Sequence, residues 1–138
     1  MDVFKNEYMQ ILFDEQNSIL ELIWLPKSEK FTDVTFRQEF ENWMSAGKKY
    51  KPKAMIVDTT TFFFPLSPEN QLWIAEFHKA LGVTQLAMVF ANDIFAQVSL
   101  EQTIDKFATV TKERGSNKQE IILQYFDNVI KAREWILQ

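Results

Sequence analysis

The sequence predicts an α/β fold: a single mixed five-stranded sheet, with an N-terminal antiparallel hairpin and then parallel strands, and about four helices. Three observations support it. Two short apolar segments near the N-terminus are separated only by a polar turn. After them, segments with helical and strand periodicity alternate along the chain. The later strand segments are apolar on both faces, as in a sheet that helices cover. The length of 138 residues suits one domain, which we expect to span residues 1–138.

The hairpin is predicted from residues 8–13 and 18–25, which read as strands on either side of the polar turn at residues 14–17. In the second strand, Leu20, Leu22 and Trp24 share one face. The opposite face is also mostly apolar, with Glu21 among its residues, so we expect this strand to be covered on both sides.

The first helix is predicted over residues 32–49. Thr32 is a suitable N-cap, and Phe36, Phe40 and Trp43 recur at helical spacing as a buried stripe. The basic run over residues 48–53 follows. We interpret it as a helix C-terminus, where cations complement the helix dipole, in preference to a patch that binds phosphate.

The central stretch, residues 53–69, contains a strand, a loop and a helix start. An apolar strand over residues 54–57 leads to Asp58, and the loop that follows carries three consecutive phenylalanines. Ser67-Pro68 is typical of a helix start, with serine as the N-cap and proline at the first helical position. Gly82 is a natural left-handed terminator for this helix.

The remaining elements follow the same alternation. A fourth strand over residues 86–90 leads to Asn92-Asp93, and the capping-box pattern at residues 99–102 predicts a third helix. A fifth strand is expected over residues 121–126. Asp127 can cap the last helix, whose apolar positions continue to Ile136.

Composition narrows the classes of function. The chain has no cysteine, which excludes disulfides, thiolate nucleophiles and cysteine-ligated metals. Its net charge of −4 argues against a nucleic-acid partner. We find no apolar run long enough for a membrane span and no glycine-rich phosphate loop. We therefore expect a cytoplasmic protein without a cofactor.

The order of elements resembles the STAS superfamily, typified by bacterial anti-sigma-factor antagonists, and the related CRAL-TRIO lipid-binding domain is similar in topology. The resemblance rests on the stretch from Lys51 to Ser67, on the apolar strand over residues 86–90, and on the terminal segment from Phe126 to Ile136. In the antagonists, a serine at the corresponding helix start is phosphorylated to block binding of a partner kinase.

The residues of this loop match the antagonist pattern in part. Asp58 stands at its first acid, Phe64 at its aromatic residue and Ser67 at its phosphorylatable serine. Leu66 replaces the acid before the serine, and Pro68-Glu69 replaces the Ser-Gly after it. The resemblance thus implies a regulatory module, with Ser67 as the candidate phosphosite and a plain N-cap as the alternative.

Three further residues invite a chemical interpretation. Asp58 and Asp93 follow neighbouring strands and would suit Mg²⁺, or they cap loops, and the set of ligands is incomplete. His78 is the only histidine and lies within a helix with no visible orienting partner. We therefore assign no catalytic residue and no metal site.

An aromatic set is the most suggestive feature, because the predicted sheet order gathers its members at one end. Three consecutive phenylalanines cannot all enter one core, so we expect a pocket or an exposed patch unless nearby loops and the N-terminal segment, through Phe4, cover them. The members are Trp24, Phe62, Phe63, Phe64, Trp73 and Phe95.

The leading hypothesis is a non-enzymatic interaction module of STAS type. It would bind a protein partner, or itself as a homodimer, through an aromatic surface near residues 62–64. The alternatives are a carrier of a small hydrophobic ligand or lipid in an apolar pocket, and a switch controlled by phosphorylation at Ser67. An enzyme that uses Asp58 and Asp93 comes after these.

Overall fold

The computed structural model describes residues 1–62, 64, 67–90 and 121–138, and these ranges contain six strands, three α-helices and one 3₁₀ helix. The elements are β1 (Asp2–Lys5), β2 (Met9–Asp14), β3 (Ile19–Trp24), η1 (Pro26–Lys30), α1 (Asp33–Tyr50), β4 (Ala54–Thr59), α2 (Pro68–Ala80), β5 (Gln85–Phe90), β6 (Ile122–Phe126) and α4 (Val129–Leu137). The fold is therefore α/β, as predicted.

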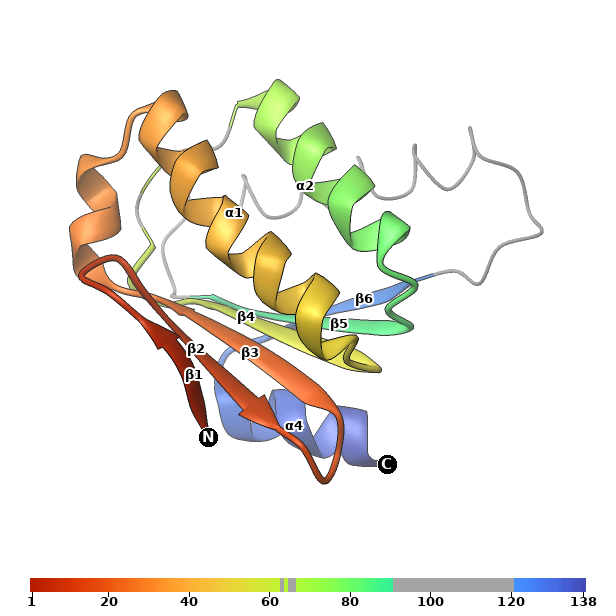
Figure 1. Cartoon of the computed structure of the whole chain (residues 1–138). Coiled ribbons are helices and arrows are strands. Elements are labelled where there is room, and N and C mark those ends of the chain that lie inside the picture. Colours follow the sequence, from red (N-terminus) through yellow and green to blue (C-terminus); the bar gives the residue numbers. More distant parts are fainter. Residues whose placement is uncertain (63, 65–66, 91–120) are drawn as a thin grey trace.

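One mixed sheet joins all six strands in the order β1-β2-β3-β4-β5-β6. Its first two pairings, β1 with β2 and β2 with β3, are antiparallel, and the pairings from β3 to β6 are parallel. Helices α1 and α2 lie side by side on one face of the sheet, and α4 lies on the other (Figure 1). This is the mixed arrangement that the sequence predicts.

The predicted number of strands was wrong, because the structure adds β1 at the edge of the sheet. Its four residues begin and end with charged side chains, so the sequence does not distinguish it from a tail. Asn6 makes the strand possible, since its side-chain Oδ1 accepts hydrogen bonds from the amides of Tyr8 (2.8 Å) and Met9 (2.9 Å). The Asn6 amide donates to the Met9 carbonyl at 3.0 Å, which closes the turn into β2.

The predicted hairpin is confirmed, with β2 and β3 antiparallel along their whole length. Its turn is held by Asp14, whose carboxylate accepts the Asn17 amide at 3.1 Å and the Asn17 side chain at 2.8 Å. Ser18 completes the turn in the left-handed region, at a φ of 55°.

The predicted first helix is confirmed as α1. Thr32 caps it, and Thr32 and Thr35 exchange backbone-to-side-chain hydrogen bonds in a capping box. The basic run lies where we interpreted it, since Lys48 and Lys49 occupy the last turn. Gly47 is the point of close approach to the rest of the core, because a Cβ there would lie 2.8 Å from Cδ1 of Leu81.

The later elements keep their predicted type with small shifts at their ends. Ser67 caps α2 as expected, and its side chain accepts the Asn70 amide. Gly82 has a φ of 75°, which a residue with a side chain rarely adopts. The predicted cap of the last helix was wrong, because Asn128 rather than Asp127 accepts the Lys131 amide. The helix expected after residue 99 lies outside the described residues.

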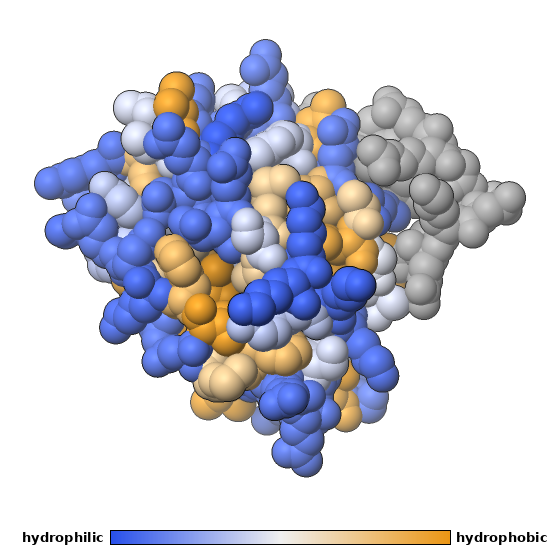
Figure 2. Space-filling model, in the orientation of Figure 1, coloured by the Kyte–Doolittle hydropathy of each residue, from blue (hydrophilic) through white to orange (hydrophobic). Residues whose placement is uncertain are grey.

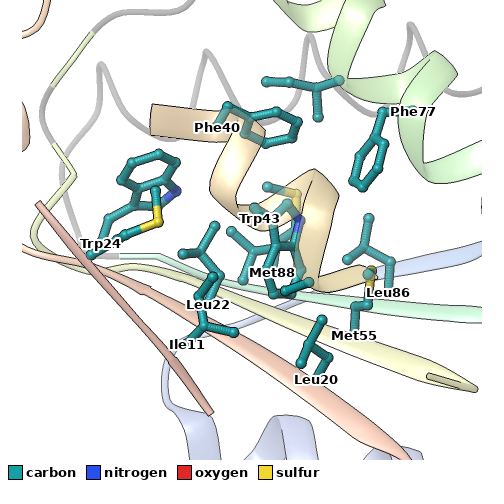
Figure 3. Packing of buried hydrophobic residues seen from close by; sticks show 14 of the residues in the cluster. Ile11, Leu20, Leu22, Trp24, Phe40, Trp43, Met55, Phe77, Leu86 and Met88 are labelled. Carbon is teal, nitrogen blue, oxygen red and sulfur yellow. The ribbon is translucent and has the colours of Figure 1, made fainter. Parts of the chain in front are cut away.

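Two cores hold the layers together. The larger lies between the sheet and α1 and α2, and Figure 3 shows Leu20, Leu22 and Met88 of the sheet pointing toward Phe40 and Trp43 of α1. The smaller lies beneath α4, where Ala132 packs against the opposite face. Every helix within the described ranges falls short of the combined length and hydropathy that a membrane span requires.

Candidate binding site

An aromatic cluster lies at the end of the sheet where α1 and α2 begin, and Phe36 of α1 is its centre. The Phe36 ring stacks on Phe64 with 5.5 Å between centroids. It also contacts Trp24 at 5.9 Å, Phe62 at 6.0 Å and Trp73 at 6.3 Å. Four of the six aromatic residues predicted to gather are therefore brought together.

These four residues differ in exposure. Trp24 is 3% exposed and Phe62 is 7% exposed, so both are core residues and offer no surface to a partner. Phe36 crosses above them from α1, and its partners were not visible in the sequence. Phe64 and Trp73 are half-buried and lie at the rim of the cluster. Phe63 and Phe95 lie outside the described residues.

A polar network joins the N-terminal turns of α1 and α2 beside this rim. The buried side chain of Asn70 is its centre. Its Oδ1 accepts from Nε of Arg37 at 2.8 Å, and its Nδ2 donates to the Asp33 carboxylate at 3.1 Å. The Arg37 guanidinium carbon lies 4.7 Å from the centroid of a Trp73 ring. The contact is a cation–π interaction, and Asn70 fixes its geometry.

Ser67, the candidate phosphosite, begins α2 next to this network. Its Oγ accepts the Asn70 amide at 3.2 Å, so the hydroxyl serves as the N-cap. The end of β4 and the residues just after it are held by threonine hydroxyls. Thr59 donates to the Val89 carbonyl and Thr61 to the Trp24 carbonyl, both at 2.6 Å.

Asp58 holds the start of the same loop. Its Oδ1 accepts the amide of Thr60 at 2.9 Å and the Thr60 hydroxyl at 2.5 Å. This is the loop-capping role that we set against a metal site. Asp93 lies outside the described residues. Within the ranges that the structure describes, no three His, Cys, Asp or Glu side chains are grouped to hold a metal ion.

A small cavity lies beneath the aromatic cluster, between the sheet and the two helices. Its volume is about 30 Å³, and most of its wall is apolar. The residues that line it are Trp24, Phe36, Phe40, Val57, Thr59, Phe62, Ile74, His78, Leu86 and Met88. Pockets for drug-sized ligands have volumes of roughly 300–1,000 Å³. A lipid would enter this cavity only if α1 or α2 moved away from the sheet.

His78 is a core residue, 1% exposed. Its Nδ1 lies 2.9 Å from the Ile74 carbonyl, and because a carbonyl only accepts, Nδ1 carries the proton. Its Nε2 accepts from Nε1 of Trp43 at 3.2 Å. Burial lowers the pKa of His78 from 6.5 to about 4, more than the Ile74 hydrogen bond raises it. The neutral ring thus joins α2 to α1.

An ion pair holds α4 on the opposite face of the sheet. Nη2 of Arg133 lies 2.7 Å from the Glu21 carboxylate, and Nη1 lies 3.6 Å from that of Asp14. Burial raises the pKa of Glu21, and the Arg133 charge opposes this rise. Glu21 is therefore a structural residue of the strand that we expected to be covered on both sides.

Sequence reasoning missed the groups that join the two helices, namely the pairs Arg37–Asn70 and Trp43–His78. Their partners are 33 and 35 residues apart, and no local pattern marks them. The one available signal was that polar residues, Asn70 and His78 among them, lie on the face that α2 buries, whereas the buried stripe of α1 is apolar throughout.

Comparison with known proteins identifies no related protein. No family model matches the chain, and neither the curated proteins nor the solved structures contain a significant match to it.

Proposed function

We propose that the chain is a non-enzymatic interaction module of STAS type that binds a protein partner through the Trp73 surface, which we define as Arg37, Phe64 and Trp73. The observation that carries the proposal is Arg37 held over Trp73 at the rim of the aromatic cluster. Tryptophan and arginine are among the residues that contribute most to binding at protein interfaces. A second copy of the chain is the alternative partner at this surface.

The Trp73 surface is preorganised, which lowers the entropy cost of binding. Asn70 fixes Arg37 from one side, and Phe40 packs against the Trp73 ring with 5.1 Å between centroids. Among the described residues, no hydrogen bond uses the two Nη nitrogens of Arg37. These nitrogens suit a carboxylate on the partner, next to an apolar side chain that covers Trp73.

A charge reversal, Arg37→Glu, tests the proposal. It replaces the cation that lies over Trp73 with an anion. When the chain is used to capture proteins from native lysate, the partner should no longer be captured by this variant. Lys49→Glu is the matched control, since Lys49 also lies over a ring, 5.2 Å from the Tyr50 centroid, at the other end of α1. If both variants retain the same captured proteins and the same oligomeric state as the wild type, the proposal fails.

A phosphorylation-controlled form of this module is favoured by the position of Ser67. Its hydroxyl lies at the start of α2 and contacts Asn70, which holds Arg37. A phosphate at Ser67 would meet the free amides of the helix N-terminus and would compete for Arg37. Phosphosite mapping of native protein tests it, and an unmodified Ser67 under every growth condition would contradict it.

A further inference from the structure

The strand β1 forms one edge of the sheet, and among the described strands it is hydrogen-bonded to β2 alone. The pairing contains a β-bulge, because Asp2 lies opposite Leu12 while Phe4 lies opposite Ile11. The extra residue is Val3. A bulge, a short strand and charged side chains are features by which proteins limit the pairing of exposed sheet edges. In β1 they restrict the register in which another strand can pair with this edge.

The bulge changes which side chains of β1 share a face. Phe4 lies opposite Ile11, a residue of the core under α1, and Val3 packs against that same core. Asp2 and Lys5 lie opposite Leu12 and Gln10, which alternate with Ile11 and so face the side of α4. Thus the apolar pair points to the α1 side and the charged pair to the α4 side. In a regular strand, residues three apart would lie on opposite faces.

This arrangement is self-complementary. An antiparallel pairing of two copies of β1 can place Asp2 opposite Lys5 of the second copy and Val3 opposite its Phe4. Residues directly opposite each other in an antiparallel pair lie on the same face. A two-fold axis perpendicular to the sheet keeps every side chain on its own face. The pairing is therefore possible only because the bulge places Asp2 and Lys5 on one face and Val3 and Phe4 on the other. The same axis keeps α1 of both copies on the same side of the joined sheet.

We propose that two copies of this chain associate through β1, with Asp2 of each copy paired to Lys5 of the other. The interface is independent of the Trp73 surface. Half-buried apolar side chains near β1 would be further shielded by the second copy, and Figure 2 shows hydrophobic residues between α1 and the strands below it on an otherwise mostly hydrophilic face. Four residues from each copy give a contact below the standard interface size, so the dimer dissociates on dilution.

Exchange of the charges tests the register. Asp2→Lys places lysine against lysine in a homodimer, and Lys5→Asp places aspartate against aspartate. Each variant should weaken self-association roughly tenfold in sedimentation equilibrium, since two cross-strand ion pairs become two repulsions. An equimolar mixture of the two variants should regain the wild-type affinity as a heterodimer, because both pairs are then opposite in charge. Glu41→Lys, on the exposed side of α1, is the control.

A disulfide provides a second measurement, because the chain contains no cysteine of its own. Asp2→Cys and Lys5→Cys chains are mixed and oxidised at a concentration where the wild type associates. Opposite residues in the proposed register have Cβ atoms about 4.5–5.5 Å apart, close to disulfide geometry, whereas two copies of residue 2 are too distant. Predominance of the mixed disulfide supports the proposal. A random mixture of disulfides, or a wild type that stays monomeric at high concentration, overturns it.

Discussion

Acidification is expected to destabilise the fold through His78. The neutral ring accepts a hydrogen bond from Trp43 in the core, so a proton on Nε2 would break that bond and place a charge among apolar side chains. The pKa of His78 is lowered from 6.5 to about 4. Between these values the unfolded chain binds more protons than the folded one, so stability rises with pH and is lost as the pH falls.

The size of this effect follows from the two pKa values. The linkage relation gives a loss of about 2 kcal/mol from about pH 7 to about pH 5, and about 3 kcal/mol by about pH 4. Carboxylates also titrate in this range, so their contribution must be subtracted. His78→Gln removes the titration and leaves a side-chain oxygen that can accept from Trp43.

Urea unfolding at several pH values measures the difference between the two proteins. From about pH 7 to about pH 5, the free energy of unfolding should fall by about 2 kcal/mol more in the wild type than in His78→Gln. If the free energy of unfolding depends on pH in the same way for both proteins, the reasoning is refuted, because His78 would then have the same pKa in the folded and unfolded states.

Three further predictions test the described packing, each by chemical unfolding. Gly47→Val should cost roughly 1–3 kcal/mol through overpacking, since even one Cβ would meet Cδ1 of Leu81 at 2.8 Å, and an unchanged midpoint would refute the close approach. Arg133→Ala should cost about 3 kcal/mol by leaving Glu21 buried without its cation, and adding Glu21→Gln should recover part of the loss. Ser67→Ala should cost about 1 kcal/mol and Ser67→Asp much less, because aspartate also caps helices; equal losses would contradict the capping role.

The sequence predicted elements well where local chemistry determines them. Thr32 and Ser67 mark their helix starts by capping chemistry, and the polar turn at Asp14 marks the hairpin. The edge strand β1 was missed because its stability comes from pairing with β2 and from the Asn6 turn rather than from its own pattern.

The candidate site was predicted in position but not in exposure. The order of strands and helices was enough to gather Trp24, Phe62, Phe64 and Trp73 at one end. Which of them are buried depends on how α1 crosses the sheet. Phe36 of α1 packs on the cluster, and this contact between distant elements has no local pattern in the sequence. The same holds for Arg37, because its partners lie on another helix.

Site-specific photo-crosslinking tests the central claim most directly. Val34 is 65% exposed and lies one helical turn before Arg37, whereas Ile130 is 66% exposed on α4, across the sheet. A photoreactive residue at position 34 should crosslink a protein partner in living cells, and adding Arg37→Glu to the same chain should abolish that product. The same residue at position 130 should not yield it. Equal crosslinking at both positions, or a product at position 34 that survives Arg37→Glu, would contradict binding at the Trp73 surface.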